Sequence, residues 1–92
     1  MNRWEAIKQE LVESNPDALY ADGYDEALAG IGRRCGQPDL AVYDANKIID
    51  ILARDMSEEE AVEFYEFNVV GAWVGPNTPV FLQTHFWEAD DV

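Results

Sequence analysis

Ser57-Glu58-Glu59-Glu60 is the clearest structural signal in this sequence. It has the form of a capping box, in which the serine hydroxyl accepts a bond from the amide three residues later and the third glutamate bonds back to the serine amide. The stretch therefore predicts the start of a helix. Along that helix Val62, Tyr65 and Val69 recur at helical spacing, which predicts that they form the face turned toward the core.

Three more helices are expected before this one, over residues 2–14, 24–34 and 45–54. Asn2 and Asp44 have side chains that can cap the first and the third of them. The first helix ends before Asn15-Pro16, because the residue that precedes a proline avoids the helical region. The second ends where two arginines precede Gly36, since cations and a glycine both suit a helix C-terminus.

Two short apolar runs, residues 40–43 and 80–84, predict strands that pair with each other. The expected fold class is therefore α+β, with about four helices packed around a short two-stranded β ribbon in a mostly helical chain. A chain of 92 residues has no room for two cores, so residues 1–92 are expected to form a single globular domain. The acidic end, residues 88–92, is expected to fray.

Charge is the most unusual property of the composition. Nineteen acidic and six basic residues give a formal net charge of -13, and no Lys or Arg follows Arg54. A field of this sign repels nucleic-acid phosphates and anionic membranes, so neither is expected as a direct partner. It favours a basic protein as the partner. Solubility alone explains the same imbalance equally well.

Cysteine content and hydropathy indicate a reducing compartment. Cys35 is the only cysteine, so no internal disulfide can form, whereas small secreted domains usually need such bridges. The N-terminal residues lack the apolar stretch of a signal peptide, and no run approaches the roughly 20 apolar residues of a membrane span. We therefore expect a cytoplasmic protein.

The sequence contains no coherent set of catalytic or metal-binding residues. His85 is the only histidine, and Cys35 has no histidine near it in the sequence. No phosphate-binding loop, nucleophile elbow or Cys/His cluster occurs. We therefore predict no catalytic residues, no metal and no cofactor, and an enzyme is the least favoured function.

Two surfaces are candidates for function. The first is the outward face of the helix that begins at Ser57, where glutamates recur: Glu58, Glu59, Glu60, Glu63 and Glu66. The second is a polar and aromatic pocket near residues 66–75, where an amide lies among apolar residues and small residues flank a tryptophan. Its expected lining is Tyr43, Asp44, Asn68, Trp73 and Arg33. A buried structural amide at Asn68 is the simpler explanation of the same segment.

Several segments together resemble a family of small bacteriophage and prophage proteins. They are Ala27-Leu28-Ala29-Gly30-Ile31-Gly32-Arg33-Arg34-Cys35-Gly36-Gln37-Pro38, Ala41-Val42-Tyr43-Asp44, Met56-Ser57-Glu58-Glu59-Glu60-Ala61, Glu66-Phe67-Asn68-Val69-Val70-Gly71-Ala72-Trp73-Val74-Gly75 and Thr78-Pro79-Val80-Phe81. The resemblance covers roughly residues 23–82 and contains no catalytic motif. It implies a viral accessory protein that acts in the cytoplasm of a bacterial host cell.

The resemblance and the charge together lead to two hypotheses. The first is an accessory protein that binds a basic host or defence protein, for example as an anti-CRISPR or DNA-mimic inhibitor that presents carboxylates where its target expects phosphates. The second is a module that binds and sequesters a small molecule or a nucleotide. A nucleotide site in so acidic a protein requires Arg33 and Arg34 to converge on the pocket.

Overall fold

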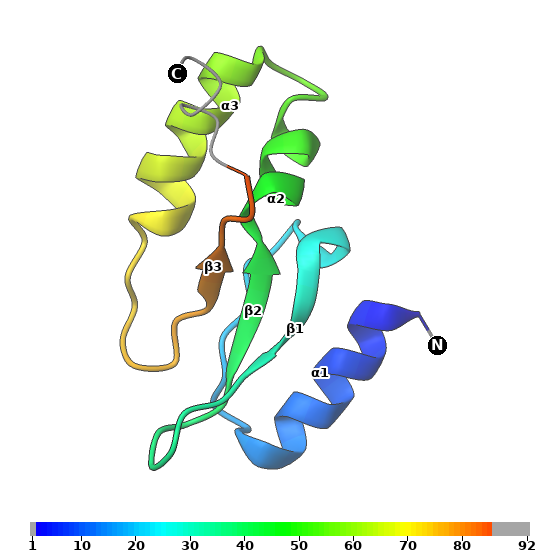
Figure 1. Ribbon diagram of the computed structural model, residues 1–92, viewed down its shortest axis with the longest axis vertical. Coiled ribbons are helices and arrows are strands. Elements are labelled where there is room, and N and C mark those ends of the chain that lie inside the picture. The colour runs from blue at the N-terminus through cyan, green and yellow to red at the C-terminus, as the bar shows by residue number, and fades with distance from the viewer. Residues whose placement is uncertain (1, 86–92) are drawn as a thin grey trace.

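The computed structural model describes residues 2–85, which contain three α-helices, two short helical segments of other types and three strands (Figure 1). In chain order these are α1 (Arg3–Ser14), η1 (Asp25–Ala27), β1 (Leu28–Gly32), β2 (Leu40–Asp44), α2 (Ala45–Leu52), α3 (Glu58–Phe64), η2 (Tyr65–Val70) and β3 (Val80–Leu82). η1 is a 3-10 helix, and η2 is a π-helix that continues α3. Every helix in the described part of the chain is too short or too polar to cross a bilayer. The predicted fraying of residues 88–92 lies outside the described residues.

The three strands form one mixed sheet in the order β1-β2-β3. β1 and β2 make an antiparallel hairpin in which Ile31 lies opposite Ala41. β3 joins the other edge of β2 in the parallel direction and places Phe81 beside Tyr43. α1 packs against β1, whereas α2 continues from the end of β2 and packs against α3 (Figure 1). The described chain is therefore a small α+β fold.

The expected arrangement of four helices around a two-stranded ribbon is wrong, because residues 28–32 form a third strand. The spacing of Leu28 and Ile31 also fits one face of a helix, which is the basis of the expectation. Gly30 and Gly32 disfavour a helix here, each by about 1 kcal/mol relative to alanine. Pairing with β2 then decides between the two conformations, since it satisfies the backbone groups of the segment.

The arginines and glycine that suggest a helix end instead form the loop of the β1–β2 hairpin. The Arg34 carbonyl accepts a bond from the Gln37 amide at 3.1 Å, which closes a turn. Gly36 within this turn has a φ of +75°, a conformation that favours glycine. The same residue types therefore reverse the chain between two strands.

The helix starts predicted at Asn2, Asp44 and Ser57 are confirmed. Each of these side chains accepts a bond from the backbone amide three residues later, and Ser57 and Glu60 make both bonds of the capping box. The strands predicted at residues 40–43 and 80–84 are present as β2 and β3, the second one shorter than expected. Local side-chain signals therefore locate most of the elements correctly.

Tyr43 is the centre of the hydrophobic core. Its side chain is fully buried, and its ring stacks on Phe81 with centroids 5.8 Å apart, while Phe81 in turn meets the ring of Tyr65 edge-on. The Tyr43 hydroxyl accepts a bond of 2.9 Å from the Ala21 amide. This residue therefore connects the sheet to both η2 and the segment that follows α1.

Asn15 holds three distant segments together. Its Nδ2 donates to the Asp39 carbonyl at 2.8 Å and to Asn77 Oδ1 at 3.0 Å, and its Oδ1 accepts from the Asp17 amide at 3.2 Å. The side chain is buried, so these bonds are shielded from water. They connect the end of α1 with the start of β2 and with the loop that precedes β3.

Candidate functional site

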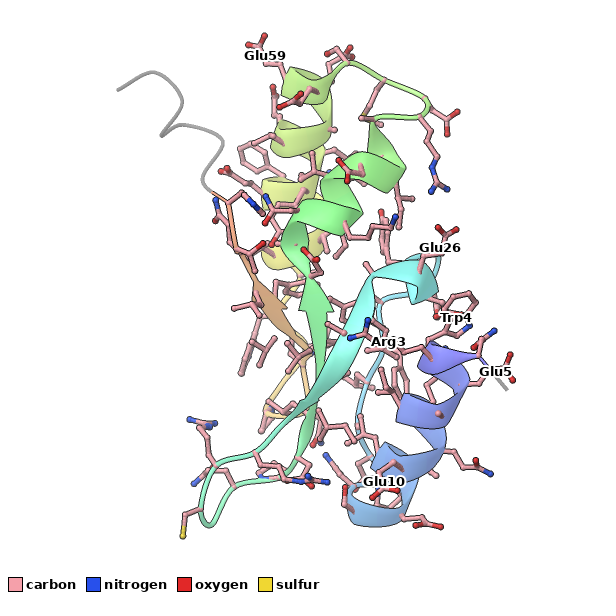
Figure 2. The ribbon with its side chains drawn as sticks, turned by 45° about the vertical axis from the view of Figure 1, so that its right-hand side comes forward. Arg3, Trp4, Glu5, Glu10, Glu26 and Glu59 are labelled. Carbon is pink, nitrogen blue, oxygen red and sulfur yellow. The ribbon has the colours of Figure 1, made fainter. Side chains whose placement is uncertain are left out.

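The glutamates of α3 and η2 form an exposed acidic face. All five predicted residues, Glu58, Glu59, Glu60, Glu63 and Glu66, are exposed, and Figure 2 shows Glu59 at the outer end of α3. The ion pairs observed within residues 2–85 join Lys8 to Asp25, Arg33 to Asp39 and Arg54 to Glu26. None of them involves this acidic face, so its charge is not neutralised by those pairs.

The five carboxylates differ in their structural roles. Glu60 Oε1 accepts bonds from the Ser57 amide and hydroxyl at 3.3 and 2.9 Å, so part of this carboxylate is used in the helix cap. Glu58 and Glu59 lie in the first turn, where the helix dipole stabilises negative charge. Glu63 lies beyond that turn and has no role in the cap. The acidic face thus combines carboxylates that start the helix with others that do not.

The wide turn of η2 shapes the surface beside this acidic face. The Gly71 amide donates to the Glu66 carbonyl five residues earlier, at 3.1 Å. A Cβ on Gly71 would lie 2.8 Å from the Phe67 carbonyl oxygen, so only glycine allows this closure. Of the inward face predicted for this helix, Tyr65 and Val69 are buried and Val62 is half-buried. π-turns are rare and are frequent at functional sites.

An open groove lies on one flank of α3 and η2. It has a volume of about 520 Å³, and its lining combines apolar side chains with two carboxylates: Met56, Glu60, Glu63, Phe64, Phe67 and Asn68. Phe64 and Phe67 expose 40% and 76% of their surface, so aromatic rings are presented to solvent next to the acidic face. We call this feature the α3 groove. Sequence reasoning missed it, although the spacing of Phe64 and Phe67 is compatible with one helix flank.

A narrower cleft lies between the segment after α1, the end of η2 and the loop that precedes β3. Its volume is about 270 Å³, and apolar and tyrosine side chains dominate its lining: Leu19, Tyr20, Ala21, Asp22, Tyr24, Asn68, Val69, Ala72, Val74, Thr78, Pro79 and Phe81. Burial raises the pKa of Tyr24. Thr78 Oγ1 accepts from the Val74 amide at 3.0 Å and donates to the Gly75 carbonyl at 2.7 Å. These bonds define one wall of what we call the η2 cleft.

The residues of the predicted pocket are divided among the two cavities, the core, a helix cap and the surface. Asn68 borders both the α3 groove and the η2 cleft, whereas Tyr43, Asp44, Trp73 and Arg33 line neither. Tyr43 is a core residue, and Asp44 accepts a bond from the Lys47 amide as the cap of α2. The Trp73 side chain is 71% exposed.

Arg33 lies in the hairpin loop and is engaged there. Its Nε donates to Asp39 Oδ2 at 3.0 Å, and this hydrogen bond lowers the pKa of Asp39. Arg33 therefore forms an ion pair with Asp39. This pair lies at the loop end of the hairpin, distant from α3 (Figure 1). No arginine within residues 2–85 lines the α3 groove or the η2 cleft, so the convergence of arginines that a nucleotide site requires is absent from both.

The remaining reactive side chains lie apart from one another. Cys35 is exposed in the hairpin loop. His85 Nδ1 lies 3.0 Å from Thr84 Oγ1, and Asn46 of α2 bonds the backbone of both residues. Within residues 2–85 no group of three or more His, Cys, Asp or Glu side chains is arranged to hold a metal ion. Comparison with protein-family models, with curated proteins and with solved structures finds no match to this chain.

Proposed function

We propose that this protein binds a basic partner protein through the acidic face of α3 and η2. The observation that carries the proposal is the set of exposed glutamates on one capped helix, none of which takes part in the ion pairs observed within residues 2–85. Charges that are not neutralised within the chain remain available to attract an oppositely charged surface. The absence of Lys and Arg after Arg54 keeps the local field negative.

The biological setting that we propose is a viral accessory protein in the cytoplasm of a bacterial host. Its target is a host or defence protein with a basic surface, and inhibition by DNA mimicry is one form of this activity. Support for the setting comes from the resemblance to phage proteins described above. Support for a protein target comes from the exposed aromatic rings beside the carboxylates, because aromatic side chains are enriched at protein–protein interfaces.

Charge reversal on the acidic face is expected to abolish most of this binding. Replacement of both Glu59 and Glu63 by lysine should weaken binding to the basic partner by about 10- to 100-fold, because each substitution replaces an attraction with a repulsion. The partner is captured from a bacterial host lysate by the immobilised 92-residue chain and measured by quantitative mass spectrometry. Capture should also fall steeply with salt, since exposed charges are screened.

The matched control reverses two exposed glutamates of α1, Glu10 and Glu13. This variant has the same net charge as the Glu59→Lys, Glu63→Lys variant but keeps the acidic face intact. It should retain most of the binding if the site lies on α3. Equal losses in the two variants would show that only the total charge matters, and capture that persists unchanged in high salt would overturn the proposal.

The η2 cleft supports a second candidate function, the binding of a small molecule. It is enclosed by three segments, its walls are mainly apolar, and the side chains of Tyr20, Asn68 and Asp22 contribute polar groups. Such a mixture is typical of ligand sites. Because no Lys or Arg is among the residues that line it, a neutral aromatic molecule fits this cleft better than an anionic nucleotide.

A thermal-shift measurement tests this second candidate. Indole, as a neutral aromatic probe, should raise Tm by about 5 °C or more at concentrations tenfold above its Kd, and AMP should not. Ala72→Trp fills the cleft and should remove the shift, whereas Val80→Trp, a substitution of an exposed residue on β3, should preserve it. An indole shift that survives Ala72→Trp, or a larger shift with AMP, would exclude this site.

A further inference from the structure

The α3 groove exposes aromatic surface that has no explanation in the packing of the described chain. Phe67 is the most exposed large apolar side chain among residues 2–85, and it shares the groove with Phe64 and Met56. Exposed apolar surface of this kind, bordered by polar groups, is characteristic of interaction sites. The groove is therefore suited to an occupant with apolar side chains of its own.

The walls of the groove are held in place by the fold. The capping box fixes Glu60 at one end, and the Asn68 Nδ2 donates to the Phe64 carbonyl at 3.3 Å on the other side. Tyr65 and Val69, on the opposite side of the same helical turns, are buried in the core. A partner thus meets a preformed surface, which lowers the ordering cost of binding.

Charge determines which apolar occupant the groove accepts. Glu60 and Glu63 lie in its lining, and Glu60 uses only its Oε1 in the cap, which leaves Oε2 for a further contact. A guanidinium or ammonium group in the groove can pair with a carboxylate and lie near an aromatic ring, and both interactions favour a cation. The lining is thus complementary to a segment that carries both aliphatic and cationic side chains.

We infer that the α3 groove receives a basic amphipathic segment of the partner protein. An aliphatic side chain of that segment packs against Phe64 and Phe67, and flanking Lys or Arg side chains pair with Glu60 and Glu63. The inference rests on the proposed function and adds to it the chemical class of the partner surface. It also explains why aromatic and acidic residues are combined on one helix flank, because a basic amphipathic helix lays its apolar face into a groove and carries its cations beside that face.

Other occupants are disfavoured by the same charges. A second copy of the chain would bring another net charge of -13 to the groove, and an anionic membrane would be repelled in the same way. The chain's own residues 86–92 begin with two aromatic residues but also carry three acidic ones. Each of these alternatives places like charges together, whereas a basic segment does not.

A pair of synthetic peptides tests the inference with the full-length protein. One peptide has Leu at helical spacing (i, i+3, i+4, i+7) and Lys at the intervening positions, so that about four helical turns have one apolar and one cationic face. The other has the same lysines with Ser in place of Leu. The Leu/Lys peptide should bind about tenfold more tightly in fluorescence anisotropy, and Phe67→Ser should remove this advantage while it leaves the Ser/Lys peptide unaffected.

Two control variants separate the groove from the rest of the surface. Val12→Ser removes an exposed apolar residue from α1 and should change neither affinity. Glu63→Gln should weaken the Leu/Lys peptide about threefold more than Glu13→Gln does, although both remove one charge. Equal effects of the two Gln variants would indicate general attraction in place of a defined groove.

The outcomes distinguish this inference from the proposed function. If both peptides bind equally and Phe67→Ser has no effect, the groove inference fails and the acidic face remains. If neither peptide binds, the proposed function fails as well. Two further results would assign the groove to another occupant. Tighter binding of the Leu/Lys peptide after substitution of Phe86 and Trp87 by Ser would assign it to the chain's own C-terminal residues. A dimer in sedimentation that Phe67→Ser dissociates would assign it to a second copy, and either result overturns the inference.

Discussion

Tyr43→Ala is expected to lower the free energy of unfolding by about 3–5 kcal/mol, the range found when large buried aromatic side chains are truncated. Tyr43 is fully buried on the central strand and stacks on Phe81. Truncation removes this contact and leaves a cavity between the sheet and η2. Because a domain of this size has a total stability on the order of 5–15 kcal/mol, the variant should be partly unfolded at moderate urea concentrations.

Two comparison variants divide this effect into its parts. Tyr43→Phe keeps the ring but removes the hydroxyl that accepts from the Ala21 amide, and it should cost about 1 kcal/mol. Trp73→Ala removes a larger ring that is mostly exposed, and it should cost less than about 0.5 kcal/mol. Urea unfolding followed by circular dichroism measures all three. A cost for Tyr43→Ala that is no larger than that for Trp73→Ala would contradict the central role of Tyr43.

Alkaline pH is expected to destabilise the fold through two buried tyrosines. Burial raises the pKa of Tyr43 and of Tyr65 to about 12 in the folded protein, compared with about 10 in an unfolded chain. Below about pH 10 both phenols are neutral in either state, so their stabilising effect is fully present. As the pH rises from about 10 toward about 12 the unfolded chain loses these protons first, so the folded state loses stability, by at most about 3 kcal/mol per tyrosine.

Urea unfolding midpoints measured between about pH 8 and 12 test this expectation. Tyrosinate absorbance should rise late and together with unfolding, because the two buried phenols ionise mainly in the unfolded chain. In Tyr43→Phe the loss of stability over this pH range should be about half that of the unmodified protein. An equal loss in both proteins would show that Tyr43 does not contribute to it.

Local signals made several elements predictable from sequence. Asn2, Asp44 and Ser57 each cap a helix by contacts within three residues, so no knowledge of the tertiary structure is needed to place them. The conformation of residues 28–32, in contrast, is not determined by local contacts, because a helix and a strand both suit the apolar spacing there. The strand prevails through pairing with β2 across the hairpin, a non-local contact that propensity does not report.

The acidic face was predictable for the same reason, since helical periodicity alone places its glutamates on the outside. The α3 groove was not, because helical spacing places Phe64 and Phe67 on one flank but does not tell whether another element covers that flank, and in the fold Phe67 is exposed. The predicted pocket depended on a polar function for Tyr43. In the fold that hydroxyl instead points inward and accepts a bond from the Ala21 amide. The residue type alone does not predict this role.

The bonds of Asn15 have a consequence for biosynthesis. Its partner Asn77 is 62 residues away along the chain, and β3 can join the sheet only after that loop has been synthesised. A ribosome-bound chain that ends before residue 77 would therefore expose the edge of β2 and the face that Phe81 covers. Folding should thus be completed late in translation, and shortened translation products should be recognised by cellular proteases as unfolded chains.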